Sequence, residues 1–288
     1  MEYQIDDAVQ FYGVIKNVKH MLSLIKAVNI KSVASFYIHE EGFILTVEDQ
    51  KSVKAIAYFK LHLFHIYNFK EGTIIPTFAI PVDTLMNCLR IMVPRMDPSN
   101  TTQGTTDYCE IKYDGTGSYL TLRRFIKEPH KNHHKALTCE LIPFEPEEES
   151  TQLHFDESTG AESQRMIIKS VWFKDLMNDL DSRYDKIKMR ISPNDPPFSV
   201  VAEGSDLLTE SDYPQDSEPF INFICDRELT YSYLYSHIVQ CKKALDISNE
   251  VSIEMFNNGS LRMFFQIEGP GNKVDTIQFN FLPSTNFT

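Results

Sequence analysis

Apolar residues recur at three- and four-residue spacing between Asn17 and Asn29, which is the pattern of one buried helix face. The apolar positions are Val18, Met21, Leu22, Ile25 and Val28. Lys19, Ser23 and Lys26 fall on another face, and Asn17 is suited to cap the first turn. The pattern predicts an amphipathic helix over this segment. Taken alone, lysines that are simply solvated are the commoner explanation of its polar face.

Alternating apolar and polar residues predict strands around this helix, with glycine at several hairpin bends. The strands expected in the first half are Phe11–Lys16, Val33–His39, Phe43–Glu48, Ser52–Lys60, Thr73–Ile80, Asp107–Tyr113, Tyr119–Ile126 and Ala136–Ile142. A second amphipathic helix is predicted over Val82–Met92. The aromatic-rich stretch Leu61–Phe69 leaves strand and helix both open.

The composition changes at Pro143–Ser163, which is acidic and turn-rich and has little to bury except Leu153 and Phe155. Such a segment is typical of a connector between domains. After it the same order of elements returns. The strands expected in the second half are Gln164–Lys169, Ile187–Ser192, Phe198–Ala202, Pro219–Cys225, Val251–Met255, Leu261–Ile267 and Thr276–Leu282. Helices are predicted over Val171–Asp181 and Tyr231–Leu245.

The spacing of corresponding residues indicates an internal duplication. Phe43 and Phe198 are 155 positions apart, and so are Leu22 and Met177. A β-α-β-β-β unit occurs four times, and a repeat of this kind outweighs local propensity in choosing a fold. We therefore expect an α+β protein with two similar domains, residues 1–142 and 164–288, joined by the connector 143–163. Each domain should carry two helices on one face of antiparallel sheet.

Composition narrows the classes of function. The net charge is −12, so any contact with nucleic acid must come from a local basic surface on an acidic body. The five cysteines show no CxxC spacing, which favours reduced thiols in the cytosol or nucleus. No apolar run is long enough to span a membrane, and the first residues lack a signal-peptide pattern. No basic cluster reads as a nuclear import signal.

Three stretches connect this arrangement to a known family: Gly42–Phe59, Ser211–Cys225 and Lys243–Gly269. With them, the chain resembles the DNA sliding clamps, which have the fold of proliferating cell nuclear antigen. It is more closely similar to the Rad-one subunits of the nine-one-one DNA-damage checkpoint clamp. The similarity runs from about Ala8 to Ser284 and rests on collinearity rather than on one diagnostic motif.

The resemblance implies a non-catalytic subunit without metal or cofactor, in a ring whose helices line the central hole. Such a ring joins this chain to two related clamp subunits in a heterotrimer. An ATP-dependent checkpoint clamp loader places it on double-stranded DNA at junctions, without reading sequence. The sequence has no GxxxxGK[ST] loop, so ATP hydrolysis belongs to that partner. Repair and checkpoint proteins would dock on it, and a nuclear location is expected.

Positions that match DNA-facing residues of the family can be carried over onto the four helices. The DNA-binding candidates are Lys19, His20, Lys26, Arg90, Lys174, Lys242 and Lys243. The third helix departs from the replicative clamp, because Asp175, Asn178 and Asp179 occupy the face where arginines are expected. This departure argues against contact between DNA and this helix.

Two further surfaces follow from the resemblance. The candidate pocket for partner proteins under the connector comprises Val53, Ala55, Leu153, Phe155, Leu282 and Pro283. An alternative is that Leu153 and Phe155 only hold the connector on the sheet. Subunit joining would use the edges at Ala136–Ile142 and about Glu203–Tyr213, with Leu137, Cys139, Leu141, Leu207 and Leu208 as interface candidates.

Catalytic alternatives have weaker support from the residues. Members of the family have been proposed to be 3′→5′ exonucleases, and Asp206, Glu210, Asp212 and Asp216 form an acidic run. Carboxylates in such a loop are more often solvated. His130, His133, His134 and Cys139 fit no standard zinc spacing. A homotrimeric replicative clamp and a scaffold that never encircles DNA remain the other hypotheses.

Overall fold

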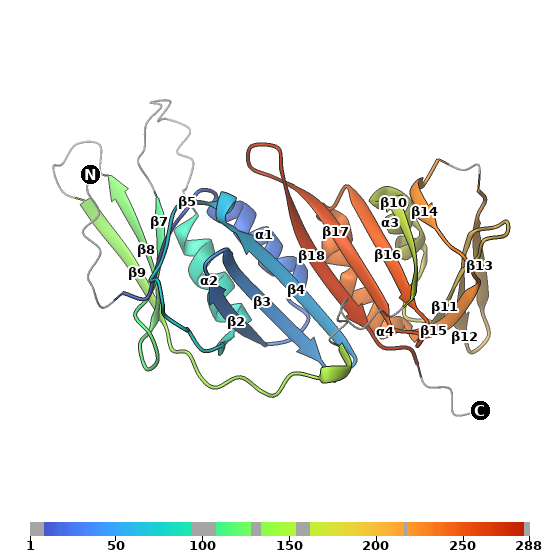
Figure 1. Cartoon of the computed structure of the whole chain (residues 1–288), viewed down its shortest axis with the longest axis horizontal. Helices are drawn as coiled ribbons and strands as arrows, with labels where there is room; N and C mark the ends of the chain where they lie inside the picture. Colours follow the sequence, from blue (N-terminus) through green and yellow to red (C-terminus); the bar gives the residue numbers. More distant parts are fainter. Residues whose placement is uncertain (1–8, 94–107, 128–133, 154–161, 216–217, 285–288) are drawn as a thin grey trace. The chain divides into compact units, whose positions relative to one another are not determined.

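The computed structural model describes residues 9–93, 108–127, 134–153, 162–215 and 218–284. The chain divides into two compact units. Unit 1 comprises residues 1–46, 58–147 and 269–273, and unit 2 comprises residues 47–57, 148–268 and 274–288. In each unit, antiparallel strands and a few short helices form an α+β fold (Figure 1).

Unit 1 contains two helices and most of the first nine strands. Its elements are β1 (Phe11–Ile15), α1 (Val18–Val28), β2 (Val33–His39), β3 (Gly42–Asp49), β4 (Val53–Lys60), the 3₁₀ turn η1 (Leu61–Leu63), β5 (Phe64–Phe69), β6 (Phe78–Pro81), α2 (Val82–Met92), β7 (Cys109–Tyr113), β8 (Leu120–Lys127) and β9 (His134–Leu141). The ends of β3 and β4 that flank their connecting turn belong to unit 2. One sheet has the order β5-β1-β7-β8-β9, and the other strands follow the order β4-β3-β2-β6.

The apolar stripe of the first helix forms the core of unit 1, as the sequence predicted. Its five predicted core positions are all buried, with exposures of at most 7%. Leu24 and Ala27 are buried as well, because α1 also packs against α2. Facing aromatic rings stabilise the sheet side, where Phe43 stacks on Phe36 and Phe59 with ring centroids 4.5 and 4.4 Å away.

Unit 2 repeats the plan with shorter helices. Its elements are the 3₁₀ turn η2 (Thr151–Leu153), β10 (Ser163–Lys169), α3 (Ser170–Asp179), β11 (Tyr184–Ile191), β12 (Phe198–Gly204), β13 (Leu208–Tyr213), β14 (Phe220–Ile224), β15 (Leu229–Leu234), α4 (Tyr235–Ile238), the 3₁₀ turn η4 (Val239–Cys241), α5 (Lys242–Ile247), β16 (Glu250–Phe256), β17 (Leu261–Gly269) and β18 (Lys273–Phe281). One strand order is β14-β10-β16-β17-β18 followed by β4, and the other is β13-β12-β11-β15.

The two strand orders match element by element. The series β5-β1-β7-β8-β9 corresponds to β14-β10-β16-β17-β18, and β4-β3-β2-β6 corresponds to β13-β12-β11-β15. In this correspondence β9 is the counterpart of β18, and β13 is the counterpart of β4. The duplication inferred from sequence spacing is therefore present in the topology.

Two predicted elements were wrong at their ends. Residues 231–234 were expected to begin a helix but lie in β15, where Tyr233 is fully buried and pairs with Ile187 of β11. Aromatic residues at the alternating positions Tyr231 and Tyr233 favour the strand there. The remainder is not one helix but α4, η4 and α5 in succession. The strand expected from Thr73 begins only at Phe78, while the undecided stretch Leu61–Phe69 forms η1 and β5.

Candidate nucleic-acid interface and partner surface

The first group of candidate cations lies on the solvent side of α1. Asn17 caps this helix, since its Oδ1 accepts a hydrogen bond of 3.0 Å from the His20 backbone N–H. Lys19 and Lys26 are exposed and two helical turns apart, so they share one face. His20 is half-buried beside them. The cap and the buried stripe together fix which side of α1 presents its cations.

The second helix runs antiparallel to the first and adds a cation near the start of α1. At one end, the Asn29 side-chain amide donates to Asp83 Oδ1 over 3.3 Å. At the other end, Lys19 and Met92 line the same small cavity, of about 110 Å³. Arg90, in the last turn of α2, is exposed and donates to Asn87 Oδ1 at 2.6 Å. The α1–α2 pair thus carries Lys26 together with Asp83 near one end, and Lys19 and Arg90 near the other.

Two further cations at that end were missed by the sequence analysis. Lys16 and Arg124 both line the cavity beside Lys19. Lys16 directly precedes Asn17, the cap of α1, so its place in the sequence could have predicted a cation near the start of this helix. Arg124 is 93% buried in β8 and donates to the Val93 carbonyl oxygen over 3.1 Å, which no local pattern reveals.

The candidate cations of unit 2 are engaged within the unit. Lys174 of α3 forms an ion pair of 2.9 Å with Asp246 of α5. The Lys242 ammonium donates over 2.9 Å to the Met177 carbonyl oxygen, near the C-terminal end of α3. Lys243 is exposed, and with Lys242 it begins α5 instead of ending a longer helix. Asp175 and Asp179 are exposed on α3. The cationic helix surface is consequently that of unit 1.

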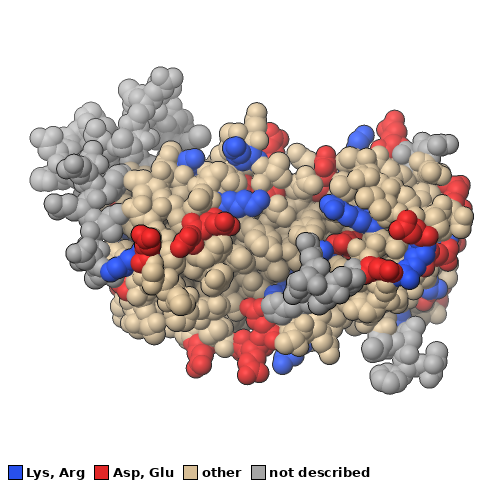
Figure 2. All heavy atoms as spheres, viewed as in Figure 1, with Lys and Arg blue, Asp and Glu red and all other residues tan. Residues whose placement is uncertain are grey.

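The strand face has a different charge distribution. Figure 2 is viewed with the strands in front of the helices, and on this face lysines, arginines and carboxylates are interspersed. No continuous cationic band crosses the part of this face that the structure describes. Cations and carboxylates are therefore mixed on this face.

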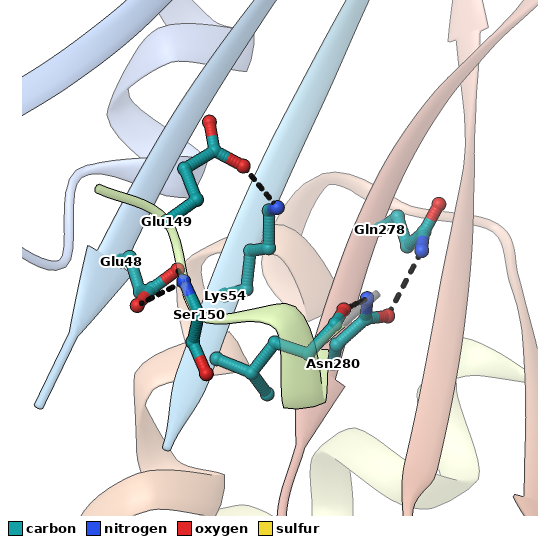
Figure 3. A network of polar contacts seen from close by, with 7 residues as sticks. Glu48, Lys54, Glu149, Ser150, Gln278 and Asn280 are labelled. Carbon is teal, nitrogen blue, oxygen red and sulfur yellow. Dashed lines mark hydrogen bonds and ion pairs between the residues drawn. The ribbon is translucent and has the colours of Figure 1, made fainter. Parts of the chain in front are cut away.

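The connector is held to unit 2 by polar contacts (Figure 3). Lys54 of β4, whose side chain is only 4% exposed, forms an ion pair with Glu149. The Ser150 backbone N–H donates to both carboxylate oxygens of Glu48, at 3.1 and 3.2 Å. The Asn280 side-chain amide donates to the Leu153 carbonyl oxygen over 2.8 Å and accepts from Gln278 over 2.9 Å.

This geometry places two of the predicted pocket residues in the core. Side chains alternate between the two faces of a strand, so Val53 and Ala55 lie on the face opposite Lys54. They pair with Phe281 and Phe279 and are fully buried in the core, away from the connector. The surface under the connector is instead polar, through Lys54, Gln278 and Asn280.

The other pocket candidates differ in placement. Leu153 is fully buried, which fits the alternative that it holds the connector on the sheet. Leu282 and Pro283 are half-buried, and the Leu282 backbone N–H donates to the Ser52 carbonyl oxygen over 3.0 Å. Phe155 lies outside the described residues.

The ion pair between Lys54 and Glu149 gives a prediction for stability. Replacing Glu149 by Ala removes a carboxylate that pairs with the buried Lys54 ammonium. We expect this to lower the free energy of unfolding by about 3 kcal/mol, near the bottom of the range for a broken buried pair because the Glu149 side chain is 31% exposed. Lys54→Met removes the buried charge itself and should stay within about 1 kcal/mol of wild type. Urea unfolding of both variants and of their combination checks this, and an unaltered Glu149→Ala midpoint contradicts it.

The proposed joining edges are both outer strands. Among the described residues, β9 pairs only with β8, and β13 pairs only with β12. Leu137 and Cys139 are half-buried on β9, while Leu141 at its end is buried. On the other edge, Leu208 is 63% exposed, and the carbonyl oxygen of the preceding Leu207 accepts from the Gly204 N–H over 2.8 Å.

The residues considered for catalysis and zinc are not brought together. Asp206 precedes β13, and Glu210 and Asp212 are exposed on that strand. No group of three or more His, Cys, Asp and Glu within the described ranges is arranged to hold a metal ion. Asp216, His130 and His133 lie outside those ranges.

No helix in the described part of the chain is long and apolar enough to cross a membrane.

The cysteines are free thiols. Burial, with the Cys139 thiol beside it, raises the pKa of Cys88 to about 11. Burial also raises the pKa of Cys109 and of Cys241, each to about 12. These three thiols stay protonated at neutral pH and act as small apolar groups.

Comparison with known proteins gives one consistent result. Residues 10–267 match the family described as "Repair protein Rad1/Rec1/Rad17". The mouse protein "Cell cycle checkpoint protein RAD1" is 27% identical over 269 residues, covering 93% of this chain and 90% of that protein. The Schizosaccharomyces pombe "DNA damage checkpoint control protein rad1" is 24% identical over 278 residues, covering 92% of this chain and 84% of that protein.

Solved structures extend the likeness to the fold. Proliferating cell nuclear antigen from Entamoeba histolytica superposes with a TM-score of 0.69 at 12% identity, covering 96% of this chain and 99% of that one. Its counterpart from Thermococcus kodakaraensis gives a TM-score of 0.68 at 14% identity, covering 95% and 99%. The α+β sliding-clamp fold expected from the sequence is confirmed.

Proposed function

Because the chain belongs to the Rad1/Rec1/Rad17 family of repair proteins and has the sliding-clamp fold, we propose that it is a non-catalytic subunit of a ring that encircles DNA in DNA-damage checkpoint signalling and repair. The ring would be a heterotrimer with two related clamp subunits. The observation that carries this proposal is the pair of outer strands, β9 and β13, whose internal counterparts pair with each other.

That internal pairing supplies a template for ring closure. Within unit 2, β18 pairs antiparallel with β4, from Ile277 opposite Ala57 to Phe281 opposite Val53. Because β9 corresponds to β18 and β13 to β4, the same pairing can form between the β9 edge of one subunit and the β13-type edge of the next. Leu141-Ile142-Pro143 at the end of β9 even matches Phe281-Leu282-Pro283 at the end of β18.

DNA would pass along the helices, where the exposed cations of the α1–α2 pair meet phosphates. Lysines and arginines in this role position the duplex without reading bases, which allows sliding. We assign this contact mainly to Lys19, Lys26 and Arg90, with His20 beside them. Lys174, Lys242 and Lys243 are secondary, because Lys174 and Lys242 already serve contacts within unit 2. The other two subunits would supply the remaining cations.

The rest of the machinery would come from partners in the nucleus. The chain has no phosphate-binding loop of the GxxxxGK[ST] type, so an ATP-dependent clamp loader would open and load the ring. Repair and checkpoint proteins would dock on it. Lys54, Gln278 and Asn280 are buried beneath the connector and already hydrogen-bonded or ion-paired there, so a partner would instead meet the half-buried Leu282 and Pro283 beside it.

The composition of the isolated complex tests the proposal directly. We expect native mass spectrometry of the complex recovered with the tagged chain to show one copy each of three different clamp-fold chains. A complex of three identical chains would instead support a homotrimeric replicative clamp. A ring that encircles DNA is retained on a closed circle but slides off linear DNA. A trimer that shows no such difference in retention would support a scaffold that does not encircle DNA.

Absence of nuclease activity is a separate prediction. Two-metal cleavage needs carboxylates that converge on ions about 4 Å apart, whereas Glu210 and Asp212 project from an outer strand. We expect wild type and a variant with Asp206, Glu210, Asp212 and Asp216 all changed to Asn or Gln to be indistinguishable in a magnesium-dependent 3′→5′ exonuclease assay. A signal that copurifies with wild type and disappears in the variant contradicts the non-catalytic assignment.

A further inference from the structure

Unit 1 has a groove that neither the DNA-facing helices nor the connector uses. It has a volume of about 370 Å³ and lies between the β2–β3 turn and the segment that follows β5. We call it the Ile74 groove, and its lining residues are Tyr37, Ile38, His39, Glu40, Glu41, Phe69, Thr73, Ile74 and Ile75. This volume is within the range of sites that bind small molecules or short peptide segments.

One wall of the groove is held rigidly in place. The Tyr67 hydroxyl lies 2.7 Å from the His39 carbonyl oxygen and 2.5 Å from that of Gly42, so it holds both ends of the turn. Burial raises the pKa of Tyr67, which keeps this hydroxyl protonated and able to donate. Gly42 has a φ of +141°, and a Cβ there would lie 2.1 Å from the Phe59 carbonyl oxygen. The turn therefore presents Glu40 and Glu41 from a fixed backbone.

The opposite wall exposes apolar surface to water. Ile74 is 89% exposed, the highest value among the large exposed apolar side chains of the described residues. Tyr37 is 44% exposed, and its ring stacks on that of His39 with centroids 5.3 Å apart. Ile75, the next residue after Ile74, is only 2% exposed, so this segment is anchored and does not simply project. Covering Ile74 and Tyr37 would remove a substantial apolar area from water.

The charge of the groove is of one sign. Glu40 and Glu41 are both exposed, and neither carboxylate forms an ion pair with a described residue. None of the nine lining residues is lysine or arginine. His39 Nδ1 accepts a hydrogen bond from the Glu41 backbone N–H over 3.3 Å, which ties its ring to the turn. An occupant that fills the groove therefore gains from carrying a positive charge beside an apolar side chain.

We propose that the Ile74 groove is a docking site for a partner-protein segment in which lysine or arginine adjoins an apolar residue. The apolar side chain packs between Ile74 and Tyr37, and the cation pairs with Glu40 and Glu41. The site is built wholly from unit 1 and does not depend on ring formation, so it goes beyond the clamp assignment. It also differs in chemistry from the surface under the connector, where the buried Lys54 is paired with Glu149 of the connector itself.

The test is selection of short random peptides displayed on phage against the full-length chain. Peptides enriched on wild type are synthesised, and their affinities are measured by fluorescence anisotropy. We expect lysine or arginine next to an apolar residue in the enriched set. Glu40→Lys combined with Glu41→Lys should weaken these peptides about tenfold or more, and so should Ile74→Ser. Bound peptide should also shift the ¹³C resonance of the Ile74 δ1 methyl group.

Matched controls distinguish binding in the groove from the effects of net charge and of nonspecific apolar contact. Glu145→Lys with Glu147→Lys makes the same change in net charge at exposed connector positions, and Val274→Ser removes an apolar side chain that is 51% exposed on β18. Both controls should retain wild-type affinity. Enrichment of peptides without lysine or arginine overturns the proposal. Equal binding by the groove and control variants, or no enrichment at all, overturns it too. None of these outcomes bears on whether the chain forms a ring.

Discussion

Replacing Lys19, Lys26 and Arg90 together by Glu is expected to release the assembled ring from DNA while leaving the protein folded. All three side chains are exposed on α1 and α2, so no core contact is lost. Each cation that no longer displaces a counterion reduces the magnitude of the salt slope by about one, and so by about three for the triple variant. Retention on closed circular DNA, measured over a series of salt concentrations, reads out both effects.

A second triple variant serves as the control. Lys51, Lys60 and Lys273 are also exposed but belong to strands or their turns, and changing them to Glu alters the net charge equally. This variant should keep near-wild-type retention, apart from a small long-range effect. Equal losses in the two variants would show that overall charge, and not the α1–α2 surface, holds DNA. Unchanged retention in the first variant would show that these residues do not face the duplex.

The elements with strong local patterns could be predicted from the sequence. In α1, the apolar stripe, the Asn17 cap and the lysine face are all determined within a dozen residues, so the burial pattern could be stated in advance. The duplication was visible because corresponding residues keep a constant spacing. Neither signal depends on which other segment a residue eventually meets.

The partner surface could not be predicted in the same way, because its character depends on distant segments. Val53 and Lys54 are adjacent in β4, and only the positions of the core and the connector decide what each meets. Glu149, which pairs with Lys54, is 95 residues away in the sequence. The pocket carried over from the clamp resemblance included Val53 and Ala55, both on the wrong face. Lys54, the residue between them, is the one that lies on the face covered by the connector.

Ion pairing between separate helices limited the charge predictions for the same reason. Lys174 was a candidate cation by its position on α3, but Asp246 on α5 meets it 72 residues later. Arg124 was missed for the opposite reason. Nothing in the sequence around this strand residue predicts a site, yet the fold places it at one cavity with Lys16 and Lys19. The same dependence on distant segments explains Tyr231–Leu234. A helix was predicted there, but pairing with β11 makes these residues a strand.

Placing proline at Leu141 is expected to block assembly with one neighbouring subunit and leave the other contact intact. Proline removes a backbone donor and is poorly tolerated inside a paired strand. The internal template locates the joint: Phe281 at the end of β18 lies opposite Val53, and the N–H of the next residue, Leu282, donates to the Ser52 carbonyl oxygen. Successive N–H groups of a strand point to opposite sides, so proline at Leu141 removes a donor toward β8 and affects the joint by distorting the end of β9. By correspondence, Leu141 would lie opposite the first residue of the neighbour's β13-type strand. Pairwise co-expression with each partner subunit, followed by size-exclusion chromatography, measures the two contacts separately.

The opposite edge provides the reciprocal variant. Leu208 begins β13 and is 63% exposed, so Leu208→Pro should block the other neighbour and spare the β9 contact. Leu141 is 2% exposed, and losing its side chain alone costs about 2–5 kcal/mol, so a Leu141→Ala variant must accompany the proline. If Leu141→Ala assembles normally and Leu141→Pro loses one neighbour only, the edge is assigned by its backbone. Loss of both neighbours with a collapsed thermal transition means that the unit has unfolded, and retention of both means that β9 is not the joining edge.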